Sequence, residues 1–165
     1  AEARAELERA VAIWTKAWGP DSPAVAMGLN GLGKIAMAED QPAEAEPYYR
    51  RALEIRRKKR PPGHPDIIDA LAQLGVALVA EKKPEAVGVL EEALAGVEHD
   101  GDATAGDRAD ARFWAARARV ELGIRRAGAL AVAAAVCKEL DVPEWQDALH
   151  ECRAWLTAHS TTAQQ

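Results

Sequence analysis

The stretch that decides the fold runs from Gly19 to Arg56 and reads GPDSPAVAMGLNGLGKIAMAEDQPAEAEPYYRRALEIR. A second stretch, from Pro62 to Val97, has the same pattern and reads PGHPDIIDALAQLGVALVAEKKPEAVGVLEEALAGV. The first halves align at an offset of 42 residues, over Pro23 and Pro65, Leu29 and Leu71, Leu32 and Leu74, and Gly33 and Gly75. The second halves align at an offset of 41, over Ala45 and Ala86, Ala52 and Ala93, and Leu53 and Leu94. Self-similarity at such a period is the signature of a repeat architecture.

Each period is predicted to hold two antiparallel helices. Apolar residues recur at three- and four-residue spacing, as at Leu71, Leu74 and Leu78, which is the spacing of one helix face. Pro42 and Pro84 suit the first turn of a helix, and the Pro/Gly clusters at 19–23 and 61–65 separate the periods. A helix pair of this size cannot bury both faces alone and therefore stacks on its neighbours. The sequence predicts an all-α solenoid of about eight antiparallel helices.

The pattern continues on both sides of the two full periods, which we place at 19–60 and 61–101. Residues 2–18 match the second half of a period, so we expect the second helix of a truncated repeat. Residues 106–140 match more weakly and are expected to form a degenerate repeat. We expect residues 1–160 to form a single domain, in a piece of a longer protein.

The C-terminal part differs from the repeats. Asp141, followed by Pro143 and Glu144, resembles an N-cap and predicts a capping helix over 141–159, with residues 160–165 as a frayed tail. An apolar stripe would cover the last repeat, and it consists of Trp145, Leu149, Cys152 and Leu156.

Composition narrows the functional classes. The net charge of −5 argues against nucleic acid as the main partner. No apolar run reaches the length of a membrane span, and no signal peptide opens the chain. The two cysteines, Cys137 and Cys152, fit a reduced compartment better than a disulfide-stapled secreted domain, so we expect a cytoplasmic protein with buried thiols.

The repeats resemble the 42-residue tetratricopeptide repeats of kinesin light chains and their bacterial relatives. The first has GPDSP, GLNGLG and EAEPYYRRALEIRRK, and the second has PGHP, ALAQLG and PEAVGVLEEAL. Residues 107–140 look like the repeat tail of multidomain bacterial serine/threonine kinases. The family implies an α-solenoid whose first helices line a concave groove for peptides or partner helices. The family also explains the glycine at position 33, where two helices approach closely. It does not explain the glycine at position 31.

The family pattern places a candidate peptide groove on the first helix of each period. The positions of the family's paired asparagines hold Asn30-Gly31 in one repeat and Ala72-Gln73 in the next. These replacements reduce the number of polar side chains that would bind a peptide backbone. The alternative is that these positions are half-buried residues of a stack without a ligand. The candidate groove residues are Met27, Asn30, Lys34, Met37, Asp69, Ala72, Gln73, Val76, Val79, Trp114 and Glu121.

Other candidate sites have structural explanations that we favour. The basic run from Arg50 to Arg60 is either a site for phosphate or an acidic partner, or a solvated face with cations near a helix C-terminus. Cys137, Cys152 and His150 lack structural-zinc spacing, and His64 belongs to the turn between repeats. We find no phosphate loop, catalytic triad or paired-carboxylate motif, so no enzyme activity, metal or cofactor is expected.

The first helix suggests self-association. Leu7, Val11, Trp14 and Trp18 lie at helical spacing, and the following repeat alone is not expected to cover all four. An exposed patch of this kind is rare on monomers, so we expect a homodimer through the N-terminal helix.

Three functions remain open at this point. The leading hypothesis is a protein-interaction scaffold with a protein or peptide partner and neither nucleic acid nor membrane. The alternatives are a homo-oligomerisation module and a non-catalytic accessory region of a bacterial serine/threonine kinase.

Overall fold

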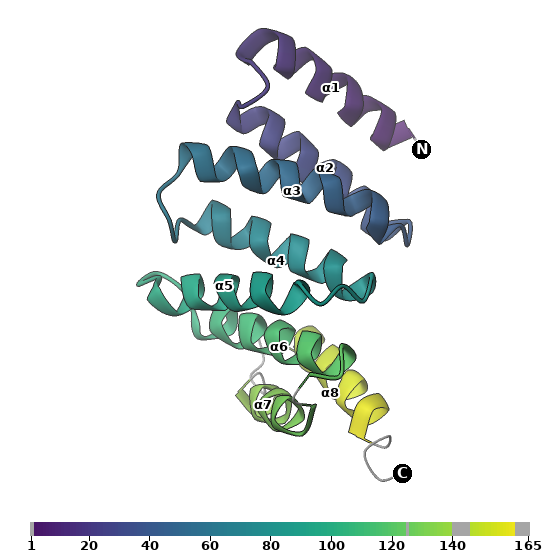
Figure 1. Ribbon diagram of the computed structural model, residues 1–165, viewed down its shortest axis with the longest axis vertical. Coiled ribbons are helices and arrows are strands. Elements are labelled where there is room, and N and C mark those ends of the chain that lie inside the picture. Colours follow the sequence, from purple (N-terminus) through teal and green to yellow (C-terminus); the bar gives the residue numbers. More distant parts are fainter. Residues whose placement is uncertain (1, 125, 140–145, 161–165) are drawn as a thin grey trace.

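The computed structural model describes residues 2–124, 126–139 and 146–160. Within these ranges the chain forms helices and no strands, which confirms the all-α prediction (Figure 1). The helices are α1 (Glu2–Trp18), α2 (Pro23–Ala38), α3 (Pro42–Lys59), α4 (Pro65–Ala80), α5 (Ala86–His99), α6 (Ala105–Glu121), α7 (Arg126–Glu139) and α8 (Gln146–Ser160). The N-cap expected at Asp141, with Pro143, Glu144 and Trp145, and the tail 161–165 lie outside the described residues.

The first helix of each period starts at a local capping signal. Ser22 caps α2 by accepting a hydrogen bond from the backbone N–H of Val25, and His64 caps α4 by accepting one from Asp66. Pro23 and Pro65 follow these caps, in the first turn where no backbone donor is needed. The turn role predicted for His64 is therefore confirmed.

The third period begins with a different cap. Thr104 and Asp107 form a capping box at the start of α6, in which each side chain accepts a hydrogen bond from the backbone N–H of the other residue. The start of α6 is thus fixed without the proline that opens α2 and α4.

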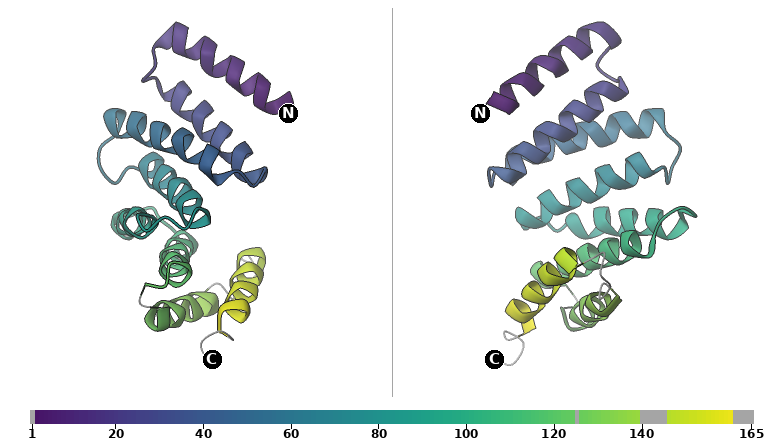
Figure 2. Two further views of the ribbon diagram at one scale, coloured as in Figure 1. Left: turned by 45° about the vertical axis from the view of Figure 1, so that its right-hand side comes forward. Right: turned by 180° about the vertical axis from the view of Figure 1, so that it is seen from behind.

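Successive helices pack side by side along the chain from α1 to α8, as both views in Figure 2 show. In addition, α4 contacts α6, so the first helices of these two adjacent pairs are neighbours. The helices stack along one direction, as expected for a solenoid in which each pair contacts the next pair (Figure 1). None of the helices in the described ranges is both long and apolar enough to cross a membrane.

Glycines let neighbouring helices approach closely. Tyr49 of α3 lies over Gly33 of α2, where a Cβ atom would come within 2.5 Å of the tyrosine ring. One period later, Leu90 of α5 covers Gly75 of α4 in the same way. The close approach predicted at Gly33 is confirmed by this contact.

Gly31, which has no family explanation, has a local one. The side chain of Leu7 in α1 packs directly on Gly31, where a Cβ atom would lie 2.6 Å from Leu7 Cδ2. Val11 and Trp14 of α1 cover Gly28 of the same helix as Gly31. The glycines of α2 therefore accept side chains from α1 on one face and from α3 on another.

Three hydrophobic clusters follow one another along the stack. One lies where α1, α2 and α3 meet, and a large central cluster joins α2 to α6. The third holds α6, α7 and α8 together, with the ring of Trp155 edge-on to Phe113 at a centroid distance of 5.5 Å.

A disulfide joins α7 to α8 and corrects the prediction for the cysteines. Cys137 and Cys152 are both buried, as their apolar stripes suggested, but their sulfur atoms are bonded and their Cα atoms lie 5.9 Å apart. The expectation of reduced thiols was therefore wrong, because sequence spacing says nothing of the distance between two helix faces. Since disulfides are rare in the cytosol, the bond also removes the cysteine argument for a cytoplasmic location.

Candidate functional site

A groove of about 460 Å³ opens where α4, α5 and α6 meet, and we call it the α4–α6 groove. Its floor is apolar and its rim carries aspartates. The lining residues are Pro65, Ile68, Asp69, Ala72, Leu90, Ala93, Val97, Asp100, Asp102, Ala103, Asp107, Asp110, Ala111 and Trp114. Three of the predicted groove residues, Asp69, Ala72 and Trp114, are brought together here.

A smaller groove of about 270 Å³ lies one period earlier, between α2, the end of α3 and the start of α4, and we call it the α2–α4 groove. Pro23 in this groove is the repeat equivalent of Pro65 in the larger one, and Met27 is the equivalent of Asp69. The two grooves are thus the same feature of the fold, filled with different side chains. Of the predicted groove residues, Met27 lies here.

The other predicted groove residues lie elsewhere. Lys34 is exposed, Met37, Gln73 and Val76 are half-buried, and Met37 packs on the central cluster. Asn30 is only 8% exposed and Val79 is buried, and neither lines either of the two grooves. The motif places these residues on the right helices, but it does not fix how far each helix is rotated toward its neighbours.

Glu121 serves the C-terminal packing instead of the groove. Its carboxylate accepts a hydrogen bond from the indole N–H of Trp155 at 3.0 Å and from Arg117 at 2.6 Å. Arg117 in turn stacks on the ring of Trp114, 4.7 Å from its centroid. Glu121 thereby ties α8 to α6 behind the groove residue Trp114.

Sequence reasoning missed the acidic part of the groove. The residues it did not single out include Asp100, Asp102, Asp107 and Asp110, which follow α5 or lie in the first turns of α6. The signal that could have found them is the aspartate-rich run from 100 to 110, which begins with Asp100 at the repeat position of Lys59.

The rim of the α4–α6 groove has a negative potential. Hydrogen bonds from Thr104 lower the pKa of Asp107, whose carboxylate they hold at the start of α6. Asp110 remains accessible to solvent but lies in a concavity, where the loss of hydration and the charges of Glu151 and Asp107 raise its pKa. A carboxylate destabilised in this way would gain from a neighbouring cation. Concave walls also concentrate the field of the charges that line them.

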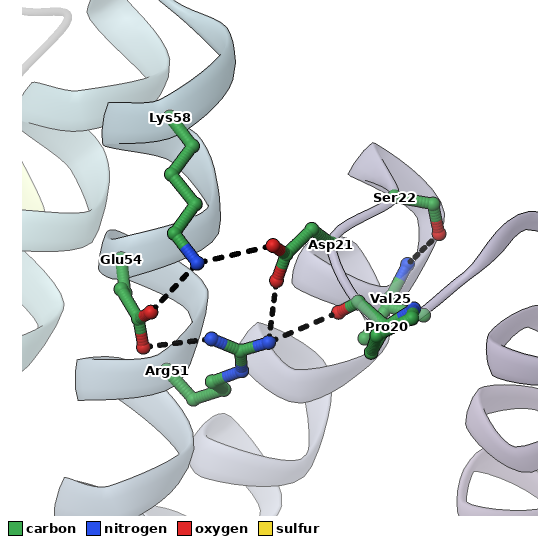
Figure 3. A network of polar contacts seen from close by, with 7 residues as sticks. All are labelled: Pro20, Asp21, Ser22, Val25, Arg51, Glu54 and Lys58. Atoms are coloured by element: carbon green, nitrogen blue, oxygen red, sulfur yellow. Dashed lines mark hydrogen bonds and ion pairs between the residues drawn. The ribbon is translucent and has the colours of Figure 1, made fainter.

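The basic run at the end of α3 is largely neutralised by ion pairs within the chain. Figure 3 shows Arg51 and Lys58 between Glu54 of the same helix and Asp21 of the turn before α2. Hydrogen bonds from Lys58 and Arg51 lower the pKa of Asp21, and those from Arg51 and Lys58 lower the pKa of Glu54. This network fixes the turn before α2 against α3.

The remaining arginines of the run also link neighbouring elements. Their partners lie on α4, on α5 and at the N-cap of α5, and the pairs join Arg50 to Glu85, Arg56 to Asp69, Arg57 to Glu92 and Arg60 to Asp66. The basic run is therefore better explained as a solvated face with cations near the C-terminus of α3 than as a site for phosphate or an acidic partner. Ion pairs between helices add to this explanation. Exposed pairs of this kind contribute little stability each.

A less exposed ion-pair cluster lies between α3 and the turn after α4. The carboxylate of Glu46, whose side chain is 13% exposed, is held by Lys83 and Arg50. The hydrogen bond from Lys83, followed by that from Arg50, lowers the pKa of Glu46 from 4.5 to about 2. A depressed pKa stabilises the folded chain above the ordinary pKa, and this stabilisation is lost as the pH falls toward the folded value.

Glu46→Gln is therefore expected to destabilise the chain near neutral pH by about 1–2 kcal/mol, as for a hydrogen-bonded charge. The difference should shrink between about pH 5 and pH 2, because the wild-type carboxyl becomes protonated there. Urea unfolding at several pH values measures it, with Glu8→Gln on the exposed face of α1 as the control. A difference that stays constant with pH would contradict the assigned ion pairs.

The candidate self-association residues do not share one exposed surface. Leu7, Val11 and Trp14 are half-buried against the glycines of α2, because α2 has no side chains at those positions to keep α1 away. Trp18 is 63% exposed, and so is Ile13 on the same helix. The large apolar side chains that α1 exposes are therefore Ile13 and Trp18, and of the four predicted residues only Trp18 is among them.

The chain can be compared with known proteins. The family model "Tetratricopeptide repeat" matches residues 1–58 and 26–99, and no curated protein matches. Two crystal structures of nearly identical TPR-like repeats from Podosopora anserina, from a protein named as a kinesin light chain, have a TM-score of 0.71 at 20% identity. They cover 99% of this chain, and the chain covers 87% of one of them, a point variant, and 88% of the other.

The crystal structure of BtubC (BKLC) from P. vanneervenii has a TM-score of 0.69 at 22% identity, over 94% of this chain and 57% of that chain. At such identities these structures show the fold alone, and they confirm the predicted α-solenoid. The family model supplies the relationship, since its two matches together cover more than half of the residues. The chain belongs to the tetratricopeptide repeat family.

Proposed function

We propose that the chain is a protein-interaction scaffold that binds a peptide or a partner helix in the α4–α6 groove. Tetratricopeptide repeats are generally protein-interaction modules, and the chain is a member of that family. The observation that carries the proposal is the groove of about 460 Å³, whose apolar floor lies within a polar rim. Binding grooves for amphipathic segments have this composition, since the floor provides burial and the rim provides orientation.

Filling the groove should weaken binding. Ala72 is half-buried on the groove face of α4, so Ala72→Trp places an indole where a ligand side chain would lie. Peptides selected from a random phage-displayed library on the wild-type chain should bind this variant at least about tenfold more weakly, equivalent to about 1.4 kcal/mol. Fluorescence anisotropy measures the affinities.

The matched control is Ala95→Trp, which adds the same ring to an exposed position of α5 that does not line the groove. Thermal melts show that both variants fold. Selected peptides that bind Ala72→Trp as tightly as they bind the control would contradict the proposal, because the working surface would then lie elsewhere.

A second candidate function is self-association, which the exposed Ile13 and Trp18 favour. Met27 on α2 is also exposed, at 61%. If these side chains pair two copies, then Ile13→Lys with Trp18→Lys should shift a concentration-dependent dimer to a monomer while the helix content stays constant. Sedimentation equilibrium measures the change. A wild-type chain that is monomeric at every concentration would refute this candidate and leave the groove proposal intact.

A further inference from the structure

The two equivalent grooves differ in the sign of their charge. The repeat offset of 41 that relates α3 to α5 places Asp100 at the position of Lys59, and Val97 at that of Arg56. The α2–α4 groove is accordingly lined by Arg56, Lys59 and Arg60, whereas the α4–α6 groove is lined by aspartates. The same concavity of the fold thus changes from basic to acidic within one period.

The charges of the smaller groove are mostly compensated within the chain. Arg56 pairs with Asp69 at 2.9 Å and donates to the backbone oxygen of Asp66 at 2.8 Å. Arg60 pairs with the carboxylate of Asp66 at 2.9 Å. A ligand carboxylate would have to compete with these partners at Arg56 and Arg60, which leaves Lys59 as the cation of this groove that has no ion pair among the described residues.

Apart from Asp69, which pairs with Arg56, the acidic rim of the larger groove is not compensated in this way. In the described part of the chain, Asp102 and Asp110 have no ion-pair partner, and Asp107 is held by the uncharged Thr104. Arg108, in the same turn of α6, donates to the backbone oxygen of Asp100 at 3.1 Å instead of to a carboxylate. The groove therefore retains free negative charge above an apolar floor that includes Ile68, Leu90 and Val97.

We propose that the α4–α6 groove selects a cationic amphipathic segment of a partner protein, with an aliphatic side chain on the apolar floor and lysine or arginine against Asp102 and Asp110. The proposal rests on the function proposed above and names the class of its partner. Charge complementarity carries it: an acidic segment would be repelled by the rim, and a neutral one would leave the carboxylates desolvated without a partner. Burial and the charges of Glu151 and Asp107 raise the pKa of Asp110, so a neighbouring cation would favour its charged form.

The charge of selected peptides provides the first test. Random displayed peptides are selected on the wild-type chain, and only those that lose binding to Ala72→Trp are sequenced. A groove-dependent set enriched in lysine or arginine next to aliphatic residues is the expected result. A groove-dependent set that is neutral or acidic would overturn this inference while the proposed function stands. If no selected peptide depends on the groove, both proposals fail.

Removing the rim charges provides the second test. The double variant Asp102→Asn with Asp110→Asn should bind a selected cationic peptide about three- to tenfold more weakly in low salt. This is the effect expected from the loss of two partly exposed ion pairs. The loss should diminish as salt is added, because screening weakens the wild-type pairs. The control is Glu6→Gln with Glu8→Gln, which removes the same number of negative charges from the exposed face of α1. Equal affinities of the rim variant and this control would overturn the assignment of the rim.

Discussion

Tyr49→Ala is expected to lower the free energy of unfolding by about 3–5 kcal/mol, as for other large aromatic-to-alanine changes in a core. Tyr49 is 1% exposed and belongs to the central cluster. Its ring lies directly over Gly33, so the two residues form one of the close contacts between α2 and α3. Truncation would leave a cavity that α2 cannot fill, because Gly33 has no side chain to move into it. Chemical denaturation measures the loss.

The chain provides a matched control at the adjacent position. Tyr48 is the same residue type on the same helix, but it is only half-buried and belongs to none of the three clusters. Tyr48→Ala should therefore change stability by about 1 kcal/mol or less. Equal losses for the two variants would show that the Tyr49–Gly33 contact does not organise the helix pair.

The next period suggests a conservative replacement. Leu90 covers Gly75 as Tyr49 covers Gly33, so the fold already accommodates leucine over glycine at the equivalent position. Tyr49→Leu should consequently lose less stability than Tyr49→Ala, because most of the buried apolar surface is kept. An alanine-like loss for the leucine variant would mean that the two contacts are not equivalent.

The fold could be predicted because its information is local and repeated. Apolar spacing marks the helices, prolines and glycines mark their ends, and two aligned periods support each other, as Pro23 and Pro65 do at the starts of α2 and α4. The close approach at Gly33 could be predicted because the family implies it, and Gly75 repeats it one period later. The contact of Leu7 with Gly31 could not be predicted, because the next period has Gln73 and no glycine at the position of Gly31.

The candidate site could be predicted only in part, because a motif assigns residues to helices but not to surfaces. Asp69 and Trp114 line the α4–α6 groove, whereas Asn30 is turned into the stack. A helix rotates by about 100° per residue, so a small change in packing angle moves a position from groove to core. Nothing in the repeat pattern marks the acidic rim, because the rim is where the periods differ.

The cysteines show the same limit of sequence-based prediction, in the part of the chain that matches the repeat pattern least. Both lie on apolar faces, which was predicted, but the bond between them depends on how α7 and α8 cross. That crossing follows from the cluster around Phe113 and Trp155, whose members come from three different helices. Long-range geometry of this kind is not contained in spacing along the chain.

Removing the disulfide is expected to destabilise the C-terminal helices by about 3 kcal/mol, the chain-entropy value for a closed loop of about 15 residues. Cys137 and Cys152 are separated by 15 residues, so the bond restricts a loop of this size in the unfolded chain. In a solenoid each repeat contacts only the adjacent repeats, so the loss should remain local. Amide hydrogen exchange should accelerate in α7 and α8 after reduction and remain unchanged in α2 and α3.

The control is Cys137→Ala with Cys152→Ala, which should exchange like the reduced wild type and show no further response to reductant. Alanine suits both positions, because they are buried among apolar side chains and a hydroxyl there would lack a partner. A thiol assay in denaturant without reductant reports the bond directly. Two free thiols in that assay would contradict the disulfide, and faster exchange throughout the chain would contradict the local character of the C-terminal cluster.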